Sequence, residues 1–106
     1  MPKYLFISSF TSEGIKGVTE KGGTARVEAA REAAKSLGGS VESYYFGFGS
    51  EDAYVTCTLP DNAAAAALAM AASGSGMVGV RTVVLLTAEE VDAVAQRQVQ
   101  YRPPGG

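Results

Sequence analysis

The sequence is short of the side chains on which most enzyme and metal chemistry depends. Its 106 residues include no histidine and one cysteine, Cys57. Histidine is the commonest general base and the commonest metal ligand, so its absence removes both roles together. A single cysteine excludes an internal disulfide and a zinc site built on cysteines. We therefore expect no metal site and no cofactor. With no histidine to activate its thiol, Cys57 is expected to be a small buried hydrophobic residue.

Long apolar runs and basic clusters are also absent. No segment approaches the roughly 20 consecutive apolar residues that span a bilayer, and the opening MPKYLFIS has no signal-peptide pattern. The nine basic and eleven acidic residues are interspersed and give a net charge of −2. No basic face suited to a phosphate backbone results. These absences predict a soluble cytoplasmic protein without a membrane or nucleic-acid partner.

The composition that remains is that of one globular domain. Hydrophobic residues make up 46% of the chain and charged residues 19%, which is the range of folded proteins. A chain of this length forms one core. We predict a single domain over residues 1–100, followed by a non-helical tail over residues 101–106 that contains two prolines and two glycines.

Four segments have the residue pattern of β-strands. Residues 3–10 are apolar on both faces, which is typical of a strand buried on both sides. In residues 53–59 the side chains alternate strictly between apolar and polar, with Val55 and Cys57 on the apolar face. The predicted strands are residues 3–10, 41–48, 53–59 and 78–86.

Three segments have the pattern of helices. Residues 24–37 place apolar side chains on one stripe, with Thr24 as the expected N-cap. Residues 62–72 are nearly all alanine and follow Asp61, a natural cap. A last helix begins at Thr87, where Thr87 and Glu90 have the spacing of a capping box. By contrast, residues 11–23 hold four glycines, so we expect a polar segment with at most a short helical turn.

The order β-α-β-β-α-β, with a helix added at the C-terminus, predicts an α+β fold of the ferredoxin-like kind. Two βαβ halves with right-handed crossovers give a four-stranded antiparallel sheet with its helices on one face. We expect the hairpin of residues 41–58 at the centre of this sheet. The strands are apolar on both sides, so the uncovered face implies a partner. The simplest partner is a second copy of the chain, related by a two-fold axis in a homodimer.

Two glycine patterns resemble phosphate-binding loops, and their context argues against both. Residues 74–79, GSGMVG, match GxGxxG by letter but follow a helix and enter a strand, the reverse of the dinucleotide arrangement. Residues 17–24, GVTEKGGT, have Gly23 in place of the lysine that contacts the phosphates. A helix lead-in is the simpler interpretation of this second pattern.

A weaker anion site near the same loop remains open. Backbone N–H groups at Gly23 and Thr24 could hold a carboxylate or phosphate at the start of the helix. Lys16, Lys21 and Arg26 are the basic side chains close to it in the sequence. Lys16 and Arg26 are therefore candidate ligand-binding residues.

The corner between the second and third strands supplies two further candidates. Asp52 either caps the turn through its own backbone or places a carboxylate at the mouth of a cleft beside Tyr44. Arg81 lies among valines in the last strand, so it must extend to solvent, pair with an acid such as Asp52 or Glu42, or face a ligand.

Several stretches together resemble the GYD-domain family, small bacterial proteins placed among the dimeric α/β-barrel folds. The resemblance covers nearly the whole length. It is carried by KYLFISSFTSEGIKG, by the Gly22-Gly23-Thr24 entry with Arg26, by YYFGFGSEDAYV, LPDNAAAAAL and RTVVLLTAEEVDA, and by the closing YRPPG. Gly49 and Asp52 fit the Gly-Tyr-Asp signature at the corner, but Ser50 and Glu51 replace its tyrosine-containing part. The family is generally described as of unknown function, so the resemblance implies the fold and a dimer.

Two functions are compatible with these observations. The first is a homo-oligomer that binds a small molecule, for which related dimeric α/β-barrel proteins imply cofactor-free oxygenase or isomerase activity as one form. Its pocket is expected between sheet and helices, lined by Tyr44, Phe46, Asp52 and Arg81. The second is a structural or regulatory assembly module without catalytic activity, in which the same side chains only pack and pair. The lack of histidine weighs against a hydrolase.

Overall fold

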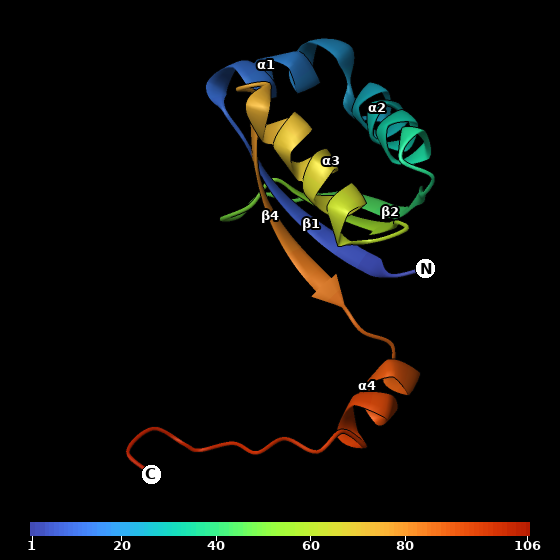
Figure 1. Cartoon of the computed structure of the whole chain (residues 1–106). Helices are drawn as coiled ribbons and strands as arrows, with labels where there is room; N and C mark the ends of the chain where they lie inside the picture. The colour runs from blue at the N-terminus through green and yellow to red at the C-terminus, as the bar shows by residue number, and fades with distance from the viewer.

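The computed structural model describes residues 1–106 as four strands and four helices (Figure 1). In chain order the elements are β1 (Lys3–Phe10), α1 (Ser12–Lys21), α2 (Gly23–Ser36), β2 (Ser40–Phe46), β3 (Ala53–Thr58), α3 (Asn62–Gly74), β4 (Val78–Leu85) and α4 (Ala88–Ala95). None of the four helices has both the length and the apolar character required to cross a bilayer.

The strands form one antiparallel sheet in the order β2-β3-β1-β4. Helices α1, α2 and α3 lie on one face of this sheet (Figure 1). The chain returns through α2 to reach β2 and through α3 to reach β4, so two βαβ units interleave. This confirms the predicted ferredoxin-like arrangement. The position expected for the β2–β3 hairpin is wrong in one respect: β3 is internal, but β2 is an edge strand because β1 pairs with β3 and β4.

The segment after β1 is a helix where the sequence predicted little structure. The hydroxyl of Thr11 caps α1 by accepting a hydrogen bond from the backbone N–H of Gly14 at 3.1 Å. A Cβ atom at Gly14 would lie 1.9 Å from the carbonyl oxygen of Met77, so glycine is what lets α1 pack against the segment before β4. This tertiary contact outweighs the low helix propensity of glycine.

Helix α2 begins one residue earlier than predicted, and Thr24 does not cap it. Its N-cap is Gly22, which has φ of 90° and makes no side-chain capping bond. Only one residue separates α1 from α2, so the chain turns at Gly22 in a conformation that glycine adopts without strain. Both ends of β1 and the starts of β3, α3 and β4 are where they were predicted, and the remaining ends differ by one or two residues, as is usual for element boundaries.

The hydrophobic core lies between the sheet and helices α2 and α3. The fully packed side chains are Tyr4, Phe6, Ala34, Val55, Cys57, Leu59 and Ala65. The hydroxyl of Tyr4 donates a hydrogen bond to Oδ1 of Asn62 at 2.6 Å, so its polar end is satisfied. Cys57 is 1% exposed, and burial, with a smaller contribution from Glu42, raises the pKa of its thiol to about 11. The expectation of a buried, unreactive cysteine is confirmed.

Helix α4 extends away from the rest of the molecule (Figure 1). The predicted capping box is present, because Thr87 and Glu90 exchange hydrogen bonds between side chain and backbone in both directions. No residue of α4 is buried, and Val91 and Val94 are about half exposed. The radius of gyration is 16.6 Å, against about 13 Å for a compact chain of this length. The apolar side of α4 therefore lacks a partner within the chain.

The sheet face opposite α1, α2 and α3, here called the open sheet face, also carries apolar side chains. Tyr45 of β2, Tyr54 of β3 and Ile7 of β1 lie directly opposite one another in the strand register. Tyr45 is 71% exposed and Tyr54 39%. Arg81 of β4 continues the same row beside Ile7. The prediction that the uncovered face is not wholly polar is confirmed.

Candidate functional site

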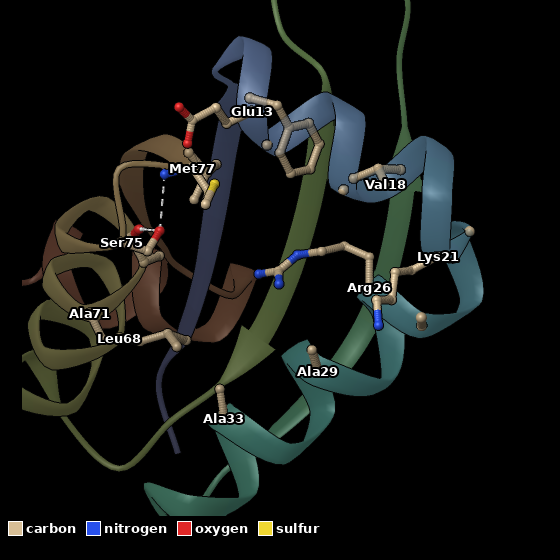
Figure 2. A pocket seen from close by; sticks show the side chains of 17 residues that line it. Glu13, Val18, Lys21, Arg26, Ala29, Ala33, Leu68, Ala71, Ser75 and Met77 are labelled. Carbon is tan, nitrogen blue, oxygen red and sulfur yellow. Dashed lines mark hydrogen bonds between the residues drawn. The ribbon is translucent and has the colours of Figure 1, made fainter.

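A cavity of about 580 Å³ lies between α1, α2, α3 and the start of β4 (Figure 2). We call it the helix-side cavity. Its walls are built mainly from glycines of α1 and alanines of α2 and α3, and larger apolar side chains close its base. The lining includes Gly14, Gly17, Ala29, Ala33, Leu68, Ala71, Ala72 and Met77. These small side chains leave the space open, and the one long side chain that extends into it is that of Arg26.

A smaller cavity of about 60 Å³ adjoins the first, deeper against the sheet. Arg26, Phe10 and Ala33 line both spaces, and Tyr44 and Cys57 line only the smaller one. The volume is roughly that of two water molecules. The two cavities therefore meet at Arg26.

Arg26 is the charged side chain at this junction. It extends from the first turn of α2 into the space between the three helices (Figure 2). Its Nε atom is buried and has no hydrogen-bond partner. The three ion pairs of the protein are Lys3–Glu42, Glu28–Arg31 and Glu51–Arg81. Arg26 takes part in none of them, so its charge is not neutralised by a carboxylate of the chain.

Tyr44 lies beside Arg26 on β2. Burial raises the pKa of its hydroxyl, and the nearby Arg26 guanidinium opposes part of that rise. The phenol is thus neutral at physiological pH and available as a hydrogen-bond donor. Phe46 follows Tyr44 on the same side of β2, with the two ring centres 5.0 Å apart. It lines neither cavity and lies instead against the start of α2, where a Cβ at Gly23 would approach its ring to 3.1 Å.

Asp52 and Arg81 lie outside both cavities. The carboxylate of Asp52 accepts a hydrogen bond from the backbone N–H of Phe10 at 2.8 Å. Its own N–H donates to the carbonyl of Ser8, also at 2.8 Å. The carbonyl of Asp52 accepts the backbone N–H of Gly47 at 2.9 Å, so its backbone closes the corner as expected, and its side chain also bonds the corner to the end of β1.

Arg81 pairs with Glu51 at 2.9 Å rather than with either acid expected from the sequence. Glu51 also accepts a hydrogen bond from the hydroxyl of Ser9. These interactions, with the Ser9 bond the larger cause, lower the pKa of Glu51. Glu42 is unavailable to Arg81 because it pairs with Lys3. Lys3, Glu42, Glu51 and Arg81 therefore form separate surface pairs.

The basic side chains named for an anion site at the start of α2 are not all on one cavity. Lys16 is exposed on α1 and lines neither cavity. Lys21, from the last turn of α1, lines the helix-side cavity together with Arg26 and with Glu13. Of the side chains singled out from the sequence, Arg26 and Tyr44 come together and Phe46 packs beside Tyr44 outside the cavities. Lys16, Asp52 and Arg81 lie elsewhere.

The lining alanines and glycines were not identified from the sequence. They carry no reactive group, and their role depends on how far the helices lie from one another. The sequence features that could have indicated the cavity are the run of alanines in residues 63–67 and the four glycines of residues 14–23. Nowhere in the structure do three His, Cys, Asp or Glu side chains gather in a way that could hold a metal ion.

The fold and cavity define an α+β domain of the ferredoxin-like class with a space between its helices and its sheet. The family model of the GYD domain matches residues 4–95. The chain therefore belongs to the GYD domain family, as the sequence resemblance implied. Neither a curated protein nor a solved structure matches the chain.

Proposed function

We propose that the protein is a homo-oligomeric small-molecule-binding domain whose ligand occupies the helix-side cavity. The observation that carries this proposal is the open volume of about 580 Å³ in a domain of 106 residues. Ligand sites are typically concave spaces of about 300–1,000 Å³ with mostly apolar walls. The helix-side cavity falls within this range.

The walls of this space support a bound occupant. The space is open to solvent on one side, since nine of its 17 lining residues are exposed. Water fills polar spaces well, but most residues that line this cavity are hydrophobic. A largely apolar small molecule is the occupant that best matches such walls.

Binding of a neutral probe tests this proposal without reference to charge. We expect octan-1-ol to shift the backbone NMR signals of α1, α2 and α3 in the wild-type protein. Ala72→Leu should reduce these shifts, because Ala72 lines both cavities and the larger leucine side chain would occupy part of the space. Ala67→Leu is the matched control, since Ala67 is exposed on the same helix and lines neither cavity. Shifts that are absent, or equal in the Ala72→Leu variant, would contradict the proposal.

The open sheet face and α4 support association with a second copy. Tyr45 and Tyr54 lie side by side and exposed on this face, next to Ile7, which is already buried within the chain. Exposed apolar patches often mark an interaction surface. Helix α4 has eight residues, too few for an isolated helix to be stable in water. In a two-fold dimer, the open sheet face and α4 of one copy would both be buried against the other copy, and the same would hold in reverse. No other chain is needed to complete the assembly.

The oligomeric state of surface variants tests the interface. We expect the wild-type protein to sediment as a dimer at micromolar concentration. Tyr54→Lys should shift it to monomer, because a lysine ammonium would be buried against the partner sheet. Met70→Lys is the control, since Met70 is 75% exposed on α3, away from the open sheet face. A monomeric wild type, or dissociation of both variants alike, would contradict this interface.

The alternative function is a structural or regulatory assembly module. The exposed row on the open sheet face favours it as strongly as it favours a ligand-binding dimer, since both need the same interface. A dimer that shows no octan-1-ol binding in the helix-side cavity would support this alternative.

A further inference from the structure

We propose that the ligand of the helix-side cavity is a small monoanion with a carboxylate head and an apolar body, and that Arg26 binds the carboxylate. This inference rests on the proposed function of the cavity and adds the chemical class of its ligand. Its starting point is the position of one side chain. Arg26 lines both cavities, and Figure 2 shows it extending from α2 into the space that the three helices enclose.

The Nε atom of Arg26 is the buried part of a guanidinium whose neighbour within the chain is the Tyr44 hydroxyl. It is buried and makes no hydrogen bond, although buried polar groups in folded proteins nearly always find partners. The guanidinium also lacks a carboxylate partner, whereas Arg31 and Arg81 each have one. A ligand carboxylate supplies the countercharge that the chain does not, because its two oxygens match the parallel N–H groups of a guanidinium fork.

The charge of the cavity wall indicates a monoanion. The ionised side chains that line the helix-side cavity are Glu13, Lys21 and Arg26. Two positive charges and one negative charge leave a net charge of +1. A carboxylate neutralises this charge, whereas a phosphate monoester at neutral pH carries close to two negative charges. The nearby Tyr44 hydroxyl, kept neutral by burial, provides a further donor for one carboxylate oxygen.

The rest of the cavity accommodates the body of the ligand. Beyond Arg26 the walls are formed by side chains such as Val18, Leu68 and Met77. The remaining polar side chains of the lining, Glu13, Lys21 and Ser75, are exposed to solvent. The head of the ligand therefore lies where the two cavities meet, and a hydrocarbon or aromatic body fills the space beneath α1 and α3.

Matched probes that differ only in the head group test the inference. Octanoate, octan-1-ol and octyl phosphate share one alkyl chain, and their dissociation constants follow from NMR titration of the full-length protein. We expect the wild type to bind octanoate at least about tenfold more tightly than octan-1-ol, as a charge-assisted hydrogen bond provides. Octyl phosphate should bind more weakly than octanoate because its second charge has no partner.

Replacing the arginine should remove the preference and leave the cavity intact. We expect Arg26→Met to bind octanoate no more tightly than octan-1-ol, while octan-1-ol still binds. Arg26→Gln, which keeps hydrogen-bonding capacity without charge, provides a second test if the methionine variant does not fold. Arg31→Met is the control on the same helix, because Arg31 pairs with Glu28 on the exposed side and lines neither cavity. It should retain the wild-type preference.

The possible failures separate the two proposals. Equal binding of octanoate and octan-1-ol by the wild type, or an octanoate preference that persists without Arg26, overturns the carboxylate inference and leaves the binding function in place. Tighter binding of octyl phosphate overturns the monoanion. If none of the three probes shifts signals of the helix-side cavity, the carboxylate inference and the binding function both fail.

Discussion

Replacing Arg26 by methionine should stabilise the ligand-free protein. The wild-type guanidinium keeps its Nε buried without a partner, and an unsatisfied buried donor costs about 1–3 kcal/mol. The lower part of that range applies, because the residue as a whole is only partly buried. Methionine retains the apolar stem and removes the donor and the charge. We therefore expect a gain of about 1 kcal/mol in the free energy of unfolding.

Urea denaturation of ligand-free protein measures this gain. The transition midpoint should rise with an unchanged m-value, and thermal unfolding should shift upward by about 4–8 °C for a domain of this size. Protein concentration must be the same for each variant, because dimerisation also stabilises the folded state. Arg31→Met is the control. It breaks an exposed pair with Glu28, a change that costs less than about 1 kcal/mol.

The sign of the effect decides the interpretation of Arg26. A loss of more than about 1 kcal/mol in Arg26→Met would mean that the guanidinium stabilises the fold itself, which would refute the reasoning from the unpartnered Nε. Saturating octanoate should reverse the order of the two proteins, because only the wild type gains the linked binding energy of the carboxylate. A stabilising replacement that abolishes ligand selectivity is the pattern expected of a binding residue.

Three further predictions concern the fold around the cavity. Burial raises the pKa of Cys57 from 9.0 to about 11, so the folded state holds this proton more tightly than the unfolded chain. The contribution of the thiol to the free energy of unfolding should be fully present below pH 9 and should fall by at most about 3 kcal/mol towards pH 11. In urea denaturation, Cys57→Ala should lose less stability over this pH range than the wild type. A fall of equal size in both proteins would show that the thiol contributes nothing. Gly14→Ala should be strongly destabilising, because its Cβ would lie 1.9 Å from the carbonyl oxygen of Met77. In Gly17→Ala the new Cβ meets no atom within 4 Å, so the free energy of unfolding should rise by about 0.5–1 kcal/mol. Equal effects on the melting temperature would contradict the close packing of α1. Asp52→Ala should lower stability by about 1–2 kcal/mol, because the backbone N–H of Phe10 loses the side-chain carboxylate that accepts its hydrogen bond. Octanoate affinity should be unchanged. Altered affinity would place Asp52 in the binding site.

The sequence predicted those parts of the fold that depend on local pattern. The alternation around Val55 and Cys57 identified β3, and the spacing of Thr87 and Glu90 identified the cap of α4. Asp61 was also identified, since its carboxylate accepts the N–H of Ala64 at 2.9 Å. Helix α1 was missed because glycine propensity is a local quantity. The contact between Gly14 and Met77 that favours the helix joins residues far apart in the chain.

The candidate site was predictable only where a residue carries its own chemistry. Arg26, a cation near the start of α2, and Tyr44, a phenol on β2, were both identified from the sequence as candidate ligand-binding residues. The partner of Arg81 was not, because Glu51 reaches it only through the conformation of the corner. The alanines that create the cavity have no chemical signature, and their effect depends on the separation of three helices. Tertiary geometry of this kind is not encoded in any short segment.

Native mass spectrometry of the protein as purified tests the central claim most directly. We expect a dimer in which each chain carries the mass of one small molecule. When the complex is broken up by collisional activation, this small molecule should be released as an anion. The Arg26→Met dimer should lack this mass. A monomer without added mass, to which neither octanoate nor octan-1-ol binds, would contradict the account.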